Sequence, residues 1–196
     1  MNYESVKNYI LNKLEKELDP RLTYHSIAHT LDVLESAVRL AELEKISSKD
    51  LLLLKTACLF HDSGMLVTYR GHEEASIQIC SQTLPSFSYS KEETETVCRM
   101  ILTTKLPQCA SELLDKILCD ADLDYLGRQD FFMIAHRLKY EWDILDIHPT
   151  TLQEWYKIQR DFLTSHRYFT ESAVKLRQSY KMENLRQVEF MCNHEK

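Results

Sequence analysis

Apolar residues recur at three- and four-residue spacings along nearly the whole chain, which is the period of an amphipathic α-helix. The 196 residues include only three glycines and four prolines, too few for the turns of a many-stranded sheet. The pattern predicts an all-α fold, a single-domain helical bundle of about eight or nine helices. We expect one domain over residues 1–196, in which residues 20–130 carry the distinctive motifs and the helices of residues 130–190 pack on that core.

Prolines and capping residues set the ends of the predicted helices. Pro20 ends the first helix, because a proline removes a backbone hydrogen bond and clashes with the preceding turn. Ser47 and Ser90 each precede an acidic residue three positions later, a pattern typical of a capping box at a helix start. The predicted helices cover about residues 3–18, 24–44, 48–61, 72–84, 91–103, 111–127, 130–142, 150–164 and 171–188.

The composition narrows the class of protein. A net charge of −6 without a block of Lys or Arg is a poor match for a protein that coats nucleic acid. Residues 1–20 lack the apolar segment of a signal peptide, and Lys55 interrupts the leucine run before it, so no membrane span is predicted. Six cysteines without C-x-x-C spacing indicate reduced thiols, mostly in the core. We therefore expect a cytoplasmic protein, either a monomer or an oligomer.

His61 and Asp62 form an adjacent imidazole–carboxylate pair at the end of the apolar run 51–60. Leu54, Cys58 and His61 follow the i, i+4, i+7 spacing of one buried helix face. Asp62 lies four residues after Cys58 and shares that face if the helix continues beyond His61. Because a buried charge is costly unless it is paired or binds a cation, this pair indicates a metal site.

Asp122 is a further candidate ligand, in the sixth predicted helix. It continues the inward face of Leu114 and Leu118 at four-residue spacing. Asp120 and Asp124 fall on the opposite side and are expected to face solvent. A carboxylate within an apolar stripe stays ionised when a cation lies beside it. The residues expected to face inward in this helix are Leu113, Leu114, Ile117, Leu118 and Ala121.

Three histidines occupy related positions. His29 lies at the rim of the apolar face of its helix, and His25 lies four residues earlier on the same side. His72 opens a later helix and faces inward with Ser76. The buried stripe expected for the helix of His29 comprises Ile27, Leu31, Leu34, Val38 and Ala41. The remaining histidines, His166 among them, have no spacing that indicates a function.

The candidate ligand set is His29, His61, Asp62 and Asp122, with His72 as a further member. These nitrogen and oxygen donors suit one divalent ion, and Mn, Mg, Zn, Fe, Ni and Co are not distinguished. A bound cation lowers the pKa of its water and so supplies a nucleophile for hydrolysis. Residues 25–29 read HSIAH and lack the Glu of H-E-x-x-H, which disfavours a zincin-type protease.

Three other polar residues each allow two interpretations. His25 either caps and solvates the helix start or acts as a catalytic acid. Arg70 and Lys105 either contact a substrate phosphate or are surface charges near helix ends.

The segments YHSIAHTLDV at residues 24–33, HD at 61–62 and AD at 121–122 resemble the H…HD…D pattern of the HD superfamily of metal-dependent phosphohydrolases. The first segment is also similar to the Y-H-x-x-x-H-x-x-D-V motif of cyclic-nucleotide phosphodiesterases within that superfamily. Segments 104–107, 120–127 and 168–170 look like those of a bacterial HD-domain subgroup. The resemblance implies an HD-domain, phosphodiesterase-like helical fold.

The resemblance also implies roles for the candidate residues. The implied metal ligands are His29, His61, Asp62 and Asp122. His25 would protonate the leaving oxygen. His72 matches a position that binds a second ion in dinuclear relatives, but the histidines that those relatives carry later in the chain are not found after Ile101. We therefore expect one firmly held ion, and a second metal is not favoured.

The resulting hypothesis is an enzyme that hydrolyses a phosphomonoester or phosphodiester of a small molecule, with a nucleotide as the favoured substrate. His25, Asp62 and Lys105 would take part in catalysis, and Arg70 with Lys105 would contact the substrate. The main rival is a non-catalytic metal-binding HD module that acts as a sensor or binds a partner. A metal-dependent oxygenase is a third hypothesis, but it needs a diiron site richer in histidine.

Overall fold

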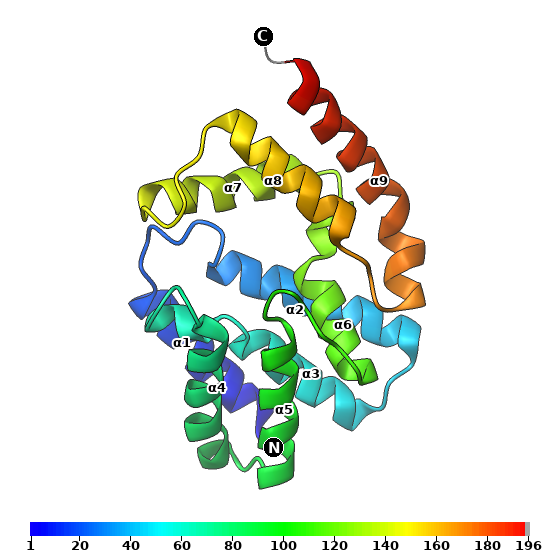
Figure 1. Ribbon diagram of the computed structural model, residues 1–196. Coiled ribbons are helices and arrows are strands. Elements are labelled where there is room, and N and C mark those ends of the chain that lie inside the picture. Colours follow the sequence, from blue (N-terminus) through cyan, green and yellow to red (C-terminus); the bar gives the residue numbers. More distant parts are fainter. Residues whose placement is uncertain (195–196) are drawn as a thin grey trace.

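The computed structural model describes the backbone of residues 1–194 and the side chains of residues 1–192. Within this part of the chain the secondary structure is entirely helical, which confirms the predicted fold class (Figure 1). The α-helices are α1 (Tyr3–Glu17), α2 (Ile27–Glu44), α3 (Ser48–Phe60), α4 (His72–Thr83), α5 (Lys91–Thr103), α6 (Leu113–Asp122), α7 (Phe131–Ile144), α8 (Leu152–Ser165) and α9 (Glu171–His194). Three short 3₁₀ helices are η1 (Ser63–Leu66), η2 (Leu84–Phe87) and η3 (Asp124–Gly127).

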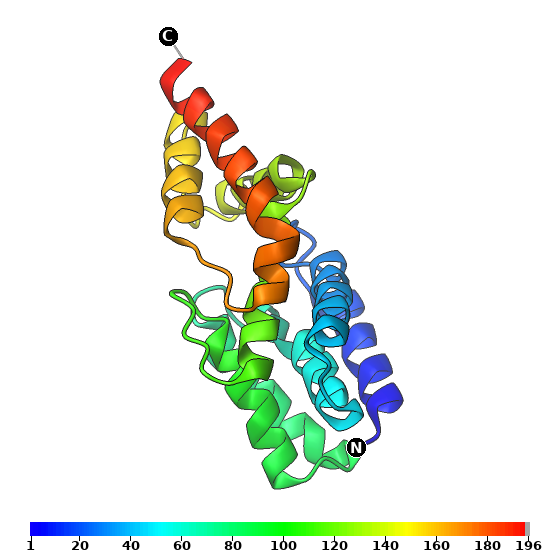
Figure 2. The same ribbon diagram turned by 90° about the vertical axis from the view of Figure 1, so that its right-hand side faces the viewer.

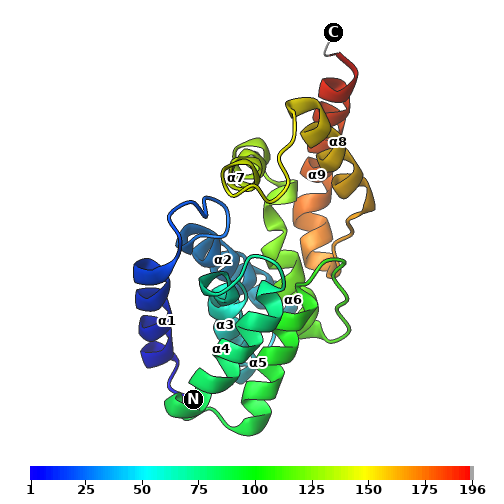
Figure 3. The ribbon, with the colours of Figure 1, turned by 60° about the vertical axis from the view of Figure 1, so that its left-hand side comes forward.

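The helices form an elongated bundle, with α1 to α5 toward one end and α7 to α9 toward the other (Figures 1 and 2). The first six α-helices share an apolar core that includes the fully buried Leu54 and Phe60. A second apolar cluster, which includes Phe131 and Trp155, joins η3 to α7, α8 and α9 (Figure 3). Full burial of such a side chain stabilises the fold by ~1.5–3 kcal/mol. The chain passes from the first cluster to the second at the end of α6, where Asp122 lies.

Local hydrogen bonds determine where several helices begin. α2 begins at Ile27 rather than at residue 24, because the extended residue Ser26 is its N-cap and accepts a hydrogen bond from the His29 N–H. Tyr24 and His25 are therefore outside the helix. The capping box predicted at Ser90 is present, as is the hydrogen bond to the Ser47 hydroxyl at the start of α3.

Gly64 allows η1 to pack closely against the start of α4. A Cβ atom at this position would lie 1.9 Å from the carbonyl oxygen of His72. The Gly64 N–H also donates a hydrogen bond of 2.7 Å to the hydroxyl of Ser76. α3 ends at Phe60, before this glycine, so Gly64 is not the stop that was predicted but a residue of η1 whose close packing sets the position of His72.

Some predicted burial positions are wrong. Leu31 and Leu113, expected to face the core, are each 42% exposed. In α2 the buried stripe is rotated toward His29, which belongs to it and does not lie at its rim. The reason is that α2 packs against both α3 and α6, so that a small polar residue such as Ser36 is buried between helices.

The prediction that Asp120 and Asp124 face solvent is also wrong, because their exposure is 0% and 1%. The Asp120 carboxylate accepts hydrogen bonds from the N–H groups of Phe169 and Thr170, at 2.7 and 2.8 Å, just before α9. Asp124 accepts a hydrogen bond of 2.7 Å from Arg177 in α9. Helical phase places both carboxylates away from the first core but does not reveal that α9 covers that side.

The described part of the chain contains no helix with the length and apolar character needed to cross a bilayer. The cysteine thiols are free, and their burial varies. Cys58, Cys80 and Cys119 are buried as predicted, whereas Cys109 is exposed.

Candidate metal centre

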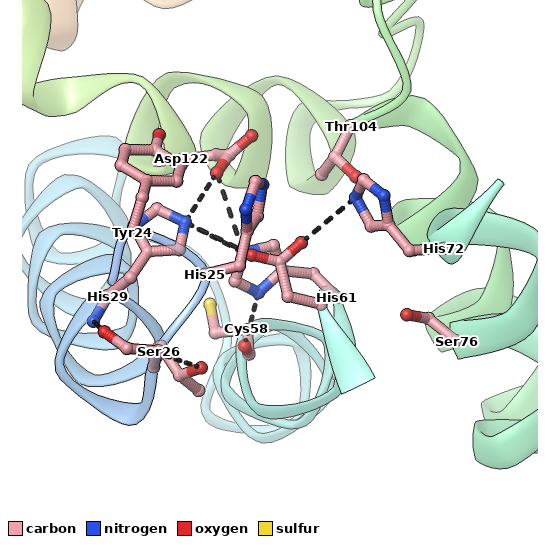
Figure 4. A network of polar contacts seen from close by, with 12 residues as sticks. Tyr24, His25, Ser26, His29, Cys58, His61, His72, Ser76, Thr104 and Asp122 are labelled. Atoms are coloured by element: carbon pink, nitrogen blue, oxygen red, sulfur yellow. Dashed lines mark hydrogen bonds and ion pairs between the residues drawn. The ribbon is translucent and has the colours of Figure 1, made fainter. Parts of the chain in front are cut away.

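Four predicted ligands converge where α2, α3 and α6 meet (Figure 4). His29 lies in the first turn of α2, His61 and Asp62 directly follow α3, and Asp122 is the last residue of α6. The backbone of Asp62 has left the helical conformation, with φ −104° and ψ 9°. Asp62 therefore reaches the site through a turn and not through a continued helix.

The donor atoms of these four side chains are close together. His29 Nε2 lies 3.2 Å from Asp122 Oδ1, 3.3 Å from His61 Nε2 and 3.4 Å from Asp62 Oδ2. His61 Nε2 lies 3.1 Å from Asp62 Oδ2 and 3.6 Å from Asp122 Oδ1. Atoms bonded to one ion at about 2.0–2.1 Å are separated by about 2.8–3.0 Å in octahedral and about 3.3–3.4 Å in tetrahedral geometry. The observed separations of 3.1 to 3.6 Å are close to those of ligands that share a cation.

Two features of the hydrogen bonding also fit a metal ion. His61 Nδ1 lies 2.8 Å from the carbonyl oxygen of Cys58, which can only accept, so Nδ1 donates and the neutral ring presents its Nε2 lone pair to the cluster. Asp62 Oδ2 is buried and faces only the Nε2 atoms of His29 and His61, without a well-aligned hydrogen bond among the described residues. When these nitrogens carry lone pairs, three acceptor atoms face one another, and a divalent cation would supply the positive charge between them.

Without a cation, imidazolium groups balance the carboxylates. Burial by itself would lower the pKa of His61, but the charge of Asp62 raises this pKa well above its usual range. Burial would raise the pKa of Asp122, but hydrogen bonds from His29 and His61 hold this pKa at about 2. The metal-free cluster therefore carries protons at neutral pH that a bound cation displaces.

His25 lies beside this cluster and is oriented by a buried glutamate. Its Nδ1 is 2.5 Å from Oε1 of Glu141, an α7 residue with no exposed surface. The Tyr69 hydroxyl donates to the same oxygen at 2.8 Å, and the backbone N–H groups of Tyr24 and His25 donate to the other at 2.8 and 3.0 Å. Burial would raise the pKa of Glu141, but the contact with His25 lowers it, so this side chain is a carboxylate. The sequence analysis did not identify Glu141.

His25, Asp62 and His72 form a second group, in which one potential ligand atom from each lies within 4.8 Å of the others. His72 Nδ1 is 2.9 Å from the carbonyl oxygen of Tyr69, and its Nε2 is 3.4 Å from Asp62 Oδ1. Asp62 thus directs one carboxylate oxygen toward each group. The expectation of one firmly held ion stays a prediction.

The two groups open into a pocket of about 260 Å³. The ligand-bearing part of its lining, which we call the polar floor, contains His25, His29, Asp62, His72 and Asp122. The other part, which we call the apolar wall, comes from α7, α8 and the segments after α5 and α6. Its members are Leu106, Leu123, Leu138, Trp142, Ile158 and Phe162. The site therefore places candidate ligands beside an apolar surface.

Arg70 and Lys105 are not among the residues that line this pocket. Arg70 is exposed, and Lys105 forms an ion pair with Glu74 while its side chain remains 49% exposed. Their assignment as phosphate contacts, and the catalytic role of Lys105, stay predictions. The structure brings the predicted His and Asp residues together and leaves these two basic residues outside.

Comparison with known proteins gives one family match and several similar folds. The HD-CE family model matches residues 19–163. A predicted HD superfamily hydrolase from an uncultured Thermotogales bacterium has 24% sequence identity and a TM-score of 0.60, with 96% of this chain and 91% of that chain covered. Bacillus subtilis YpgQ has 19% identity and a TM-score of 0.65, with 99% of each chain covered. YpgQ in complex with ADP has 16% identity and a TM-score of 0.63, with 98% of each chain covered.

No curated protein matches the chain. At these identities the solved structures support the helical fold, and the finer resemblance to cyclic-nucleotide phosphodiesterases stays a prediction. The family match spans well over half of the chain and includes every residue of the candidate centre. The chain therefore belongs to the HD-CE family.

Proposed function

We propose that this protein is a metal-dependent phosphohydrolase that cleaves a phosphomonoester or phosphodiester of a small molecule, with a nucleotide as the favoured candidate. The observation that carries the proposal is the convergence of two imidazoles and two carboxylates, in which the buried oxygen Oδ2 of Asp62 faces the Nε2 atoms of both histidines. A relative described as a predicted HD superfamily hydrolase and another bound to ADP support hydrolysis and a nucleotide, respectively.

The residues that would hold the ion are His29, His61, Asp62 and Asp122. A divalent ion bound there supplies Lewis acidity toward a phosphoryl oxygen and lowers the pKa of nearby water. The pocket would orient the phosphate ester, because the candidate ligands lie on its polar floor and most of its large apolar side chains lie on the apolar wall. The buried position of His61 and the small volume of the pocket limit access of bulk water.

His25 would donate a proton to the leaving oxygen. Glu141 accepts a hydrogen bond from His25 Nδ1, which fixes the ring orientation and directs Nε2 away from the glutamate. Tyr69 fixes the Glu141 carboxylate in turn. After the proton is donated, the neutral ring regains one from solvent at the open side of the pocket.

A metal-supplemented activity screen tests this function. Chelator-treated protein is assayed with aryl phosphates and a nucleotide panel after addition of Mn, Mg, Ni or Co, and bound metal is measured by elemental analysis. The Asp122→Asn variant is expected to lose both bound metal and turnover. Asp161→Asn is the matched control, because the Asp161 side chain is 69% exposed.

Three outcomes would contradict the proposal. Full turnover by Asp122→Asn would show that hydrolysis does not need the proposed metal centre. Bound metal without turnover of any phosphate ester would favour the non-catalytic HD module, and turnover that consumes oxygen would favour the oxygenase.

A further inference from the structure

The charge of the pocket limits how many phosphate groups a substrate can bring into it. The carboxylates of Asp62, Glu73 and Asp122 belong to its lining, and the lining residues include no Lys or Arg within the described chain. Lys105 is engaged by Glu74 outside the pocket. The floor is therefore rich in negative charge apart from its histidines and any bound cation.

The first turn of α4 would otherwise offer positive charge to a phosphate, because the N-terminus of a helix carries a partial positive charge. In this protein that turn contains Glu73 and Glu74. Glu73 lines the pocket and offsets the helix dipole on that side. The helix terminus therefore adds little attraction for a second phosphate group.

Proteins that bind polyphosphates usually surround them with Arg, Lys or backbone N–H groups, because each phosphate brings negative charge that must be paired. Here a divalent ion would have Asp62 and Asp122 as its own ligands, which already offset its charge. One phosphoryl group can lie at the ion. A second would have to lie beside Glu73 or against the apolar wall, and burial of an unpaired charge there is costly.

The apolar wall is built to contact an uncharged group. Leu138 and Trp142 on α7 are four residues apart, as are Ile158 and Phe162 on α8, so each pair lies on one face of its helix. The indole of Trp142 also packs edge-on against the fully buried Trp155, with ring centroids 5.4 Å apart. A supported aromatic surface of this kind is suited to a flat or apolar substrate group.

We propose that the substrate carries a single phosphoryl unit on a flat, largely apolar group, and that nucleoside diphosphates and triphosphates are poor substrates. This inference depends on the proposed phosphohydrolase function. The phosphoryl unit lies at the polar floor and the attached group lies against the apolar wall. The absence of Lys and Arg from the described lining, together with its carboxylates, sets the preference for one phosphate.

A comparison of kcat/KM under one fixed metal condition tests the inference. 1-Naphthyl phosphate and phenyl phosphate have leaving groups of similar acidity but differ in the size of the apolar group, whereas AMP, ADP and ATP differ in phosphate number. We expect 1-naphthyl phosphate to exceed phenyl phosphate by on the order of tenfold. We expect ADP and ATP to fall below AMP by about tenfold or more. Equal or better turnover of ATP than of AMP would overturn the proposal.

A charge variant tests the physical cause. Leu106 lines the pocket but is 57% exposed, so a lysine can be introduced there without burial in the core. Leu106→Lys is expected to raise the kcat/KM of ADP relative to AMP, and the matched variant Leu106→Gln is not. An unchanged ratio in Leu106→Lys would show that pocket charge does not set the preference.

Binding separates this inference from the function on which it depends. Calorimetric titration of metal-free protein with 1-naphthol is expected to show binding that Trp142→Ala weakens. Hydrolysis of ATP and AMP with equal efficiency would overturn the inference and leave the phosphohydrolase function intact. Binding of 1-naphthol with no hydrolysis of any phosphate ester would overturn the function and leave the apolar site intact. No binding of 1-naphthol would overturn the role of the apolar wall.

Discussion

Glu141 Oε1 lies 2.5 Å from His25 Nδ1 although the two residues are 116 positions apart in the chain. The contact joins α7 to the extended segment before α2. Glu141, the partner of the proposed catalytic acid His25, thus lies outside the segment that carries the H…HD…D motif. The C-terminal helices are therefore part of the site. The apolar wall, also from α7 and α8, leads to the same conclusion.

The first prediction concerns Glu141→Gln. The amide keeps the size of the side chain and can still accept a hydrogen bond from His25, but the short contact between the carboxylate and the ring is weakened, so the ring is held less firmly. We expect kcat to fall by about 10- to 100-fold with little change in KM. Metal content should remain, because Glu141 is not one of the four ligands.

Tyr69→Phe is the matched control for this prediction. It removes the hydroxyl that donates to the same carboxylate oxygen but leaves the charge in place. We expect a smaller loss of kcat than in Glu141→Gln. Loss of bound metal in Glu141→Gln, or an unchanged kcat, would contradict the positioning role of Glu141.

Metal binding should release protons. The charge of Asp62 raises the pKa of His61 well above its usual range against the effect of burial, so the metal-free protein holds a proton there at pH 7. A cation requires the neutral ring as ligand, so binding is expected to release about one proton or more and to become tighter as pH rises. Calorimetric titration in buffers of different ionisation enthalpy measures this release, and pH-independent binding would refute it.

Gly64→Ala should be more destabilising than Gly71→Ala. The new methyl group at residue 64 would collide with the backbone of His72, where a Cβ lies 1.9 Å from the carbonyl oxygen. The nearest atom at residue 71 is a side-chain oxygen of Glu74 at 3.6 Å, and the cost there comes from its positive φ of 73°. We expect the free energy of unfolding to fall by about 3 kcal/mol in Gly64→Ala and by about 1 kcal/mol in Gly71→Ala. Urea denaturation measures both, and equal losses would show that α4 moves away easily.

His166 should make the fold sensitive to acid. Burial and then the charge of Lys181, whose Nζ is 3.3 Å from His166 Nδ1, lower the pKa of His166 to about 3. The unfolded chain takes up this proton at about pH 6.5, so the free energy of unfolding falls as pH decreases from about 6.5 toward 3. His166→Asn is expected to reduce that fall between pH 7 and pH 4 by roughly 2 kcal/mol. Parallel urea-denaturation curves for the two proteins across this range would contradict the assignment.

The local pattern of apolar, capping and proline residues was sufficient to predict most of the helices. Capping at Ser90 and the proline at residue 20 act within one helical turn, so the ends that they set agree with the structure to within a few residues. The adjacency of His61 and Asp62 likewise needed no tertiary information. Helical phase placed His29 only at the rim of its apolar face, and the resemblance to the HD superfamily implied it as a ligand. The structure places His29, His61 and Asp62 beside Asp122.

Residues that depend on packing between distant helices could not be assigned from the pattern. Asp120 and Asp124 are buried because α9 covers them, and no periodicity within α6 reveals that partner. Glu141 had only a weak signal, a carboxylate next to Trp142 on a helix whose apolar residues face inward. Its partner His25 could be recognised only once α7 was placed beside the segment before α2.

The central claim is that His29, His61, Asp62 and Asp122 bind one divalent ion. A crystal grown with Mn²⁺ and measured at a wavelength where manganese scatters anomalously tests it most directly. We predict an anomalous peak bonded to the two Nε2 atoms and to both carboxylates, at about 2.0–2.3 Å from each donor. A density map without a peak among these four side chains, in crystals that bind Mn²⁺ elsewhere or not at all, would contradict the claim.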